Sequence, residues 1–327
     1  MYLKSIFTFI SFFYISFSYS QTNIKDIETN HPVSYATVSF GDGQGLFADD
    51  EGTFFFTKKL YPDIDSLYIS ALGYKDMALS TNSLPKTIHL KIEHDVLDEV
   101  LIHAKIDRKF KEATIKPYLD DDYYKCWLPT IESEIAVFFK TETPKLKQLS
   151  EIHFPIALES KNWGKRKRAN ADKQPFSTLF KVNIYKNESG YPGEIINTSN
   201  IVFRATEKHG DVYNLDISEH NIFIPENGFF VSLQVLGYTD KVGKLLPNKK
   251  YKEITNGNRT VKIPTNFRPL LPFTDQISQN NTFIKRVFLQ RNSWVKFEKG
   301  SSISSTLLKT GLNNYGVGIT YKIYKDE

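Results

Sequence analysis

The sequence contains a single cysteine among 327 residues, so no disulfide bond within one chain can support its fold. Beyond the first twenty residues it also lacks a hydrophobic run long enough to span a membrane. The excess of one charge sign is small: the sequence has 42 Lys and Arg and 37 Asp and Glu, which gives a net charge of +5. Such a surplus favours polyanion binding only where it is concentrated. With 40% hydrophobic residues, the composition is typical of a folded globular protein rather than a disordered or collagen-like one.

The familiar catalytic motifs are missing as well. A zinc peptidase of the carboxypeptidase type needs a His with a Glu three residues later, and none of the seven histidines has one. The patterns H-E-x-x-H and G-x-S-x-G are also absent. Gly41, Gly43 and Gly45 connect two expected strands instead of opening a helix, which predicts a turn rather than a phosphate loop. We therefore expect no metal and no cofactor, and the sequence favours a protein that is not an enzyme.

The first twenty residues have the pattern of a secretory signal peptide. Lys4 precedes an apolar run over residues 6–17, and small residues at Ser18 and Ser20 precede Gln21. An uncleaved anchor is the alternative, but the run is shorter than the roughly 20 residues that span a membrane. We expect cleavage after Ser20, no transmembrane segment in the mature chain, and a periplasmic, outer-membrane-associated or secreted protein.

Cys126 is unusual in an exported protein. Either it is a reactive or intermolecular thiol, or it is a small residue buried beside Trp127, and the sequence favours burial.

Short runs of β-branched and aromatic residues, separated by turn clusters, predict an all-β fold. A first series of strands is expected at 33–40, 53–56, 66–70, 87–92 and 100–103. A second series is expected at 134–139, 149–154, 179–185, 212–217, 221–224, 229–235, 260–263, 283–289, 294–297 and 317–324. Regular short strands of this kind are typical of β-sandwiches.

Alternation within residues 179–185 predicts which side chains face the core. Phe180, Val182 and Ile184 are expected to point inward, and the intervening Lys181, Asn183 and Tyr185 to face solvent.

The expected domains are a signal peptide at 1–20, a small β-sandwich at 21–103, a connector at 104–125 and a larger β-sandwich at 126–327. The connector is charged and lacks strand alternation, and we expect it to be partly helical around Ile106 to Ala113.

Several short motifs of the first series occur in the order of a known family. They are Asp26, Pro32-Val33, Ala36-Thr37-Val38, Gly45, Phe47, Asp50-Glu51-Gly52-Thr53-Phe54, Ser70-Ala71-Leu72-Gly73-Tyr74, Leu90 and Leu97-Asp98-Glu99-Val100. Together they resemble the carboxypeptidase regulatory-like domain over about Ile24 to Ile102. The resemblance implies a small transthyretin-like, Ig-like β-sandwich of the bacterial envelope without catalytic activity. The usual first strand is abbreviated around Asn23 to Lys25, so this sandwich is expected to be incomplete at one edge.

The second series is similar to jelly-roll β-sandwich modules of extracytoplasmic proteins, on the strength of residues 180–185, Pro192-Gly193 and residues 215–217. This weaker resemblance serves only as an indication of fold.

The candidate binding residues lie in a basic segment, defined here as Lys161 to Arg168, which carries five positive charges in eight residues. The candidates are Trp163, Lys165, Arg166, Lys167 and Arg168. Such a segment attracts sulfated or phosphorylated polymers, lipid headgroups or lipopolysaccharide, and a Trp can stack on a sugar. The other interpretation, which the sequence favours slightly, is a solvated loop between two strands. Nucleic acid is disfavoured as a partner because the chain is expected to be exported.

Three groups of acidic residues offer other sites. Asp49-Asp50-Glu51 and Asp120-Asp121-Asp122 could bind Ca²⁺, but a turn already accounts for the first group and a solvated acidic stretch is favoured for the second. Glu132, Glu134, Glu226 and Asp240 are the possible members of an acid pair for glycoside hydrolysis.

The leading hypothesis is therefore a non-catalytic envelope protein that acts as a binding or scaffolding module, for a glycan, a polyanion or another envelope protein. A hydrolase of glycan or peptide, with carboxylates on the second sandwich, is one alternative. An accessory subunit of an outer-membrane transport complex, with an outer-membrane protein as partner, is the other.

Overall fold

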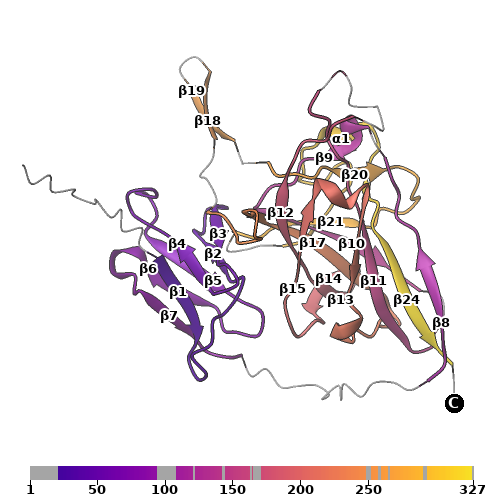
Figure 1. Ribbon diagram of the computed structural model, residues 1–327, viewed down its shortest axis with the longest axis horizontal. Helices are drawn as coiled ribbons and strands as arrows, with labels where there is room; N and C mark the ends of the chain where they lie inside the picture. Colours follow the sequence, from indigo (N-terminus) through magenta and orange to yellow (C-terminus); the bar gives the residue numbers. More distant parts are fainter. Residues whose placement is uncertain are drawn as a thin grey trace, which may run out of the picture.

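A computed structural model describes residues 21–93 and 108–325, apart from 121, 142–143, 163, 165–170, 248–251, 257–258, 264–265 and 290–292. The expected signal peptide and the expected strand at 100–103 lie outside the described residues. The described part of the chain is all-β, as predicted, and built from several sheets in a sandwich-like arrangement (Figure 1). Its one α-helix is the single turn α1, Thr306–Lys309.

Two small sheets form the first sandwich, which comprises residues 21–93. One has the order β4-β1-β7 and the other β3-β2-β5-β6. Their strands are β1 Gln21–Asp26, β2 Thr37–Ser39, β3 Gly45–Phe47, β4 Thr53–Phe55, β5 Ser66–Ser70, β6 Met77–Ser80 and β7 Thr87–Leu90. Residues of both sheets, such as Ile24 and Leu67, are fully buried in one apolar cluster. This shared core holds the two sheets face to face.

The first strand is complete, which corrects the expectation of an abbreviated strand and an incomplete edge. β1 is six residues long and lies in the middle of its sheet, antiparallel to β4 and parallel to β7. Gly52 supports this arrangement because it has a φ of +69°, and a Cβ there would lie 2.5 Å from the Ile24 carbonyl oxygen. Only glycine fits such a turn against the central strand.

Two larger sheets follow along the chain. An eight-stranded sheet has the order β14-β13-β17-β10-β21-β22, with β12 paired to β17 and β15 to β12, and a four-stranded sheet has the order β16-β11-β24-β8. The strands of the first are β10 Ser133–Phe139, β12 Ser177–Val182, β13 Ile184–Glu188, β14 Tyr191–Ile195, β15 Ile201–Thr206, β17 Phe229–Tyr238, β21 Thr282–Arg286 and β22 Val295–Lys296. The strands of the second are β8 Phe110–Ile115, β11 Lys147–Pro155, β16 Val212–Asp216 and β24 Gly318–Tyr324. Ile135, Ile152 and Ile319 belong to one apolar cluster, so both sheets enclose a common core.

Five short strands lie outside these sheets. β20 Leu271–Thr274 pairs with β9 Cys126–Trp127 on one side and with β23 Asn314–Tyr315 on the other. β18 Lys252–Asn256 and β19 Arg259–Ile263 form a hairpin.

The expected connector contains a strand where a helix was expected. Phe110–Ile115 forms β8, which pairs antiparallel with β24 along its whole length. The expectation of helix was wrong because β8 is an exposed edge strand, so its charged residues hide the alternation that marks a half-buried strand.

Two other expectations about strands need correction. The run at 179–185 is divided between β12 and β13, with a break at Asn183. Residues 221–224 make only an isolated pairing, between Phe223 and Gln148.

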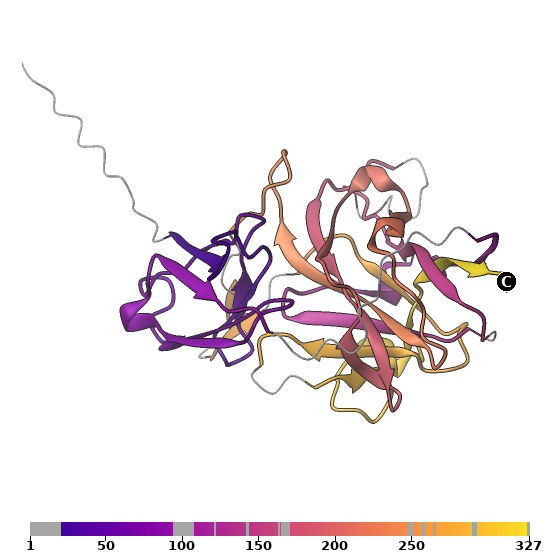
Figure 2. The same cartoon turned by 90° about the horizontal axis from the view of Figure 1, so that it is seen from below.

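The first sandwich packs on the outer face of the eight-stranded sheet (Figures 1 and 2). Phe47 of β3 shares an apolar cluster with Leu236 and Phe288, and the Ser39 hydroxyl donates a hydrogen bond of 2.6 Å to the Phe288 carbonyl. A Cβ at Gly45 would come within 2.4 Å of the Phe288 ring, so this close approach requires glycine. The apolar cluster of Phe47, Leu236 and Phe288 joins the first sandwich to the larger sheets, so the structure does not separate them into two independent domains. The expected domain boundaries therefore remain predictions.

Candidate functional site

A row of polar residues crosses the outer face of the eight-stranded sheet. Strand register places Lys181 of β12 opposite Gln234 of β17, Gln234 opposite Glu134 of β10, and Glu134 opposite Lys285 of β21. We call these four residues the junction row. Alternation explains their direction, because Ile135 and Val137 on either side of Ala136 face the core, and Glu134 therefore points away from it.

Glu134 is the centre of this row and is almost completely buried. Its Oε1 accepts hydrogen bonds from Ser232 Oγ at 2.6 Å, Tyr185 Oη at 2.7 Å and Asn183 Nδ2 at 3.0 Å. Its Oε2 lies 3.0 Å from Lys285 Nζ. Burial by itself would raise the pKa of Glu134, but Lys285 and the three donors outweigh burial and lower it. The carboxyl group is therefore ionised at neutral pH.

Aromatic rings complete the environment of Lys285. Its Nζ lies 4.6 Å from the Trp294 ring centroid and 5.3 Å from the Tyr185 ring centroid. Both distances are within the range of a cation–π interaction. Burial and the Glu134 carboxylate raise the pKa of Tyr185 well above its usual value, so the phenol stays protonated as a donor.

Lys181, at the other end of the row, has no comparable partner. Its side chain is buried with 8% relative exposure, and it makes no hydrogen bond or ion pair within the described part of the chain. Burial lowers the pKa of Lys181 to about 8, against a smaller opposing effect of Glu134. At neutral pH the cluster thus holds two lysine cations and one carboxylate. One positive charge is left without a counterion.

Asn183 is incompletely satisfied as well. Its Nδ2 donates to Glu134, but its Oδ1 is buried without a hydrogen-bond partner among the described residues. A buried polar atom without a partner is uncommon in proteins and costs about 1–3 kcal/mol.

A cavity of about 210 Å³ lies where these groups meet the first sandwich. We call it the junction cavity. Lys181, Asn183, Gln234, Glu134, Tyr185 and Lys285 line it on the sheet side, and Thr37, Ser70, Ala71 and Leu72 line it on the side of the first sandwich. Lys181 can therefore supply one cation, and Gln234, Thr37 and Ser70 can supply hydrogen-bonding groups, to a molecule in the cavity. Acid–base hydrolysis would need a second carboxyl group, and the lining contains only Glu134.

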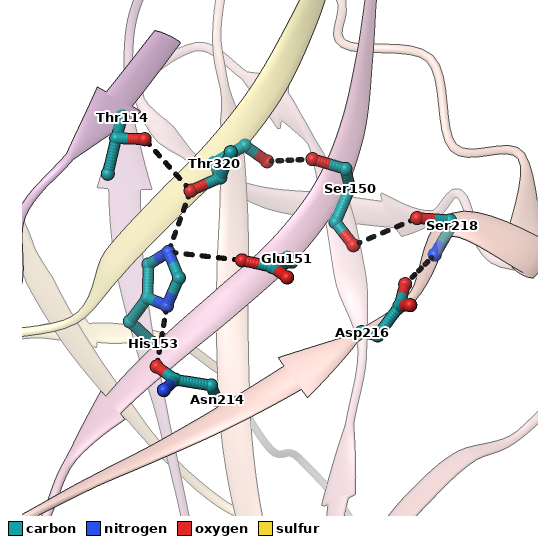
Figure 3. A network of polar contacts seen from close by, with 8 residues as sticks. All are labelled: Thr114, Ser150, Glu151, His153, Asn214, Asp216, Ser218 and Thr320. Carbon is teal, nitrogen blue, oxygen red and sulfur yellow. Dashed lines mark hydrogen bonds and ion pairs between the residues drawn. The ribbon is translucent and has the colours of Figure 1, made fainter. Parts of the chain in front are cut away.

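A second polar arrangement crosses the four-stranded sheet (Figure 3). His153 of β11 lies between Asn214 of β16, with Nδ1 and Oδ1 2.8 Å apart, and Thr320 of β24, with Nε2 and Oγ1 2.8 Å apart. Thr114 of β8 lies beyond, its hydroxyl 3.0 Å from that of Thr320. We call these four residues the His153 ladder.

The order hydroxyl, imidazole and amide is the order of a nucleophile relay. In this chain, however, His153 and Asn214 are directly opposed cross-strand neighbours, as are Thr320 and Thr114. Each polar atom of the His153 side chain has a partner in the ladder. The arrangement is that of a satisfied polar ladder, which stabilises the pairing of strands.

The candidate residues of the basic segment, Trp163, Lys165, Arg166, Lys167 and Arg168, all lie outside the described residues. The chain on either side is described. Ser160 pairs with Lys173, and the Lys161 amide donates to the Asp172 carbonyl at 2.8 Å, so residues 160–161 lie beside residues 172–173.

The acidic candidates do not gather at one site. Glu132 is buried with its Oε1 3.5 Å from Arg286 Nη2, and burial raises its pKa. Asp240 accepts three backbone amides of the turn that follows it. Asp49 likewise accepts the amides of Glu51 and Thr53, as a turn residue does.

The other candidates have structural contacts too. Asp120 pairs with Lys125 at 2.8 Å, and Asp122 accepts the amide of Tyr124 at 3.1 Å, whereas Asp121 is outside the described residues.

Among the described residues, no group of three or more His, Cys, Asp or Glu could hold a metal ion. No helix in those parts is long and apolar enough to cross a membrane. Cys126 is half-buried, and its Sγ lies 3.4 Å from the Asp122 carbonyl.

The expectation that Lys181, Asn183 and Tyr185 face solvent was wrong. All three are buried, because the outer face of their sheet lies against the first sandwich and a layer of aromatic side chains. The sequence signal that could have identified them as buried is that Lys181 and Asn183 are polar residues within a strand whose other residues are strongly apolar.

Comparison of the chain with protein-family models, with curated proteins and with solved structures found no match. The resemblance to the carboxypeptidase regulatory-like domain and to jelly-roll modules therefore stays a prediction.

Proposed function

We propose that this protein is an exported, non-catalytic binding protein of the bacterial envelope, and that its ligand enters the junction cavity. The observation that carries the proposal is the Lys181 side chain on the cavity wall, which is largely buried and has no hydrogen bond or ion pair among the described residues. Holding a charge in such a place is costly unless something pairs with it. A ligand that supplies an anion would remove that cost.

The signal-peptide pattern of residues 1–20 supports export, and the resemblance over residues 24–102 supports the envelope. Neither bears on the ligand. The glycan, the polyanion and the protein partner therefore remain alternatives at this stage, and the basic segment is a second possible contact for a polymer.

A hydrolase is the less favoured function. Glu134 is ion-paired and its pKa is lowered, whereas a general acid needs a raised pKa. Burial raises the pKa of another candidate acid, Glu132, but this residue is paired with Arg286 and does not line the junction cavity. An accessory role in a transport complex is compatible with a binding site, and copurification of an outer-membrane protein would support it.

The test is calorimetric titration of the mature chain, Gln21–Glu327, with neutral sugars, acidic sugars, sulfated glycans and lipopolysaccharide. Two variants accompany it: Lys181→Met in the cavity, and a fourfold Ala variant at Lys165, Arg166, Lys167 and Arg168. We expect binding that is lost in the first variant and retained in the second. Binding lost only in the fourfold variant would move the site to the basic segment, and product release from any glycan would establish the hydrolase instead.

A further inference from the structure

From the lining of the junction cavity we infer that its ligand is a ring-sized carboxylate with hydroxyl groups, that is, an acidic sugar unit, either free or at the end of a glycan. This inference rests on the proposed function, because it assumes that the cavity is a binding site. Three features of the lining carry it: the charge balance, the hydrogen-bonding groups and the volume.

The charge balance selects a monoanion. Two lysines, Lys181 and Lys285, face one carboxylate, Glu134, and Lys285 is already paired with it at 3.0 Å. The site therefore has one uncompensated positive charge, on Lys181. A carboxylate carries one negative charge and balances it, whereas a phosphate monoester carries about −1.5 to −2 at pH 7 and would leave an excess beside Glu134.

The hydrogen-bonding groups select a hydroxylated molecule. Gln234, Thr37 and Ser70 place an amide and two hydroxyl groups around the cavity. Each of these groups can both donate to and accept from ligand hydroxyls. Leu72 supplies an apolar wall, against which the C–H face of a sugar ring can pack.

The volume limits the ligand to about one ring. The junction cavity measures about 210 Å³, and a protein cavity of about 150 Å³ holds one benzene molecule. Its wall includes the half-exposed Ile195, so a linked sugar could extend outward from the bound unit.

The inference is tested with four matched probes: methyl glucuronoside, its methyl ester, methyl glucoside and glucose 6-phosphate. We expect the acid to bind at least tenfold more tightly than the ester, the neutral glucoside and the phosphate. Lys181→Met should weaken binding of the acid at least thirtyfold and abolish the preference for the acid over the neutral glucoside. Lys186→Met is the matched control, because Lys186 is an exposed lysine on neighbouring β13 that pairs with Glu194, and we expect no change in affinity.

Proton uptake provides a readout that a structural role for Lys181 would not give. The groups that face its ammonium are Glu134 of β10, Lys285 of β21 and Tyr185 of β13, and the first sandwich contributes the uncharged Thr37 and Ser70. A bound carboxylate raises the pKa of Lys181, so binding at pH 8 to 8.5 should take up a proton. Titration in two buffers of different ionisation enthalpy measures this uptake, which Lys181→Met should abolish.

The outcomes separate the inference from the proposed function. If the neutral glucoside or the phosphate binds as tightly as the acid, and filling the cavity by Ser70→Phe removes that binding, the cavity is a binding site but the inferred ligand class is wrong. If none of the four probes binds to a correctly folded chain, the inference fails. If the wider panel of glycans also fails to bind, the proposed function fails with it.

Discussion

The junction row and the His153 ladder both cross four adjacent strands, yet they differ in how their polar atoms are satisfied. In the ladder, each ring nitrogen of His153 has a partner at 2.8 Å, and two of the four residues, Thr114 and Asn214, are exposed to solvent. In the junction row the side chains are largely buried and one lysine lacks a counterion. Polar groups that are fully hydrogen-bonded on a solvent-exposed face, as in the His153 ladder, are accounted for by their role in pairing the strands. A buried charge without a partner does not contribute to stability, which points to a role in binding.

The largest effect that separates the two arrangements is expected at Glu134. Glu134→Gln removes the charge that balances Lys285 and leaves the half-buried Lys285 and the buried Lys181 without a carboxylate between them. Breaking a buried ion pair in this way costs about 3–5 kcal/mol. We expect that loss in the free energy of unfolding measured by urea denaturation.

The matched control is Glu151→Gln, since Glu151 is a half-exposed residue that lies 3.9 Å from His153 in the other sheet. It should cost less than about 1 kcal/mol. Equal losses in the two variants would mean that Glu134 is not the electrostatic centre of a buried cluster.

The next effect has the opposite sign. Lys181→Met removes a buried charge and keeps a flexible apolar side chain, so the ligand-free protein should gain about 2–3 kcal/mol of unfolding free energy at pH 7. In the wild type, the pKa of Lys181 is about 8 when folded and 10.5 when unfolded. Between these two values the unfolded chain binds more protons, so the wild type becomes more stable with rising pH.

The stability difference between Lys181→Met and the wild type should therefore shrink above pH 8 and vanish near pH 10.5. Denaturation of both proteins at pH 7, 8.5 and 10 measures it. Other groups that titrate in this range affect both proteins alike and cancel. A destabilised Lys181→Met variant would show that this lysine is a structural counterion for Glu134 rather than a group held for a ligand.

The sequence predicted more about the fold than about the site. β-branched and aromatic runs identified most of the core strands, because a half-buried strand such as β5 alternates between buried and partly exposed residues along its sequence. The edge strand β8 was not predicted, because its residues are mostly exposed and show no alternation of apolar and polar side chains. Alternation also grouped Lys181, Asn183 and Tyr185 correctly on one face.

What the alternation could not reveal is that the first sandwich covers part of that face. The covering depends on contacts between residues far apart in the sequence, such as Ser39 with Phe288. For the same reason the partner of Glu134 was not predictable, because Lys285 follows it by about 150 residues and meets it only through the register of β10 with β21. Local pattern therefore predicts which residues share a surface, and only the tertiary arrangement decides which polar groups on that surface are left without partners.

The smallest effect is expected at the centre of the His153 ladder. His153→Ala removes the hydrogen bonds to Asn214 and Thr320, but Asn214 is exposed and Thr320 retains its contact with Thr114. Water can replace the lost partners on a wet face, so the expected cost is about 1 kcal/mol of unfolding free energy. Affinity for a junction-cavity ligand should not change, because the ladder lies on the other large sheet. A loss of binding or of any hydrolytic activity in this variant would show that the hydroxyl, imidazole and amide act as a relay, and would reverse the assignment of the two arrangements.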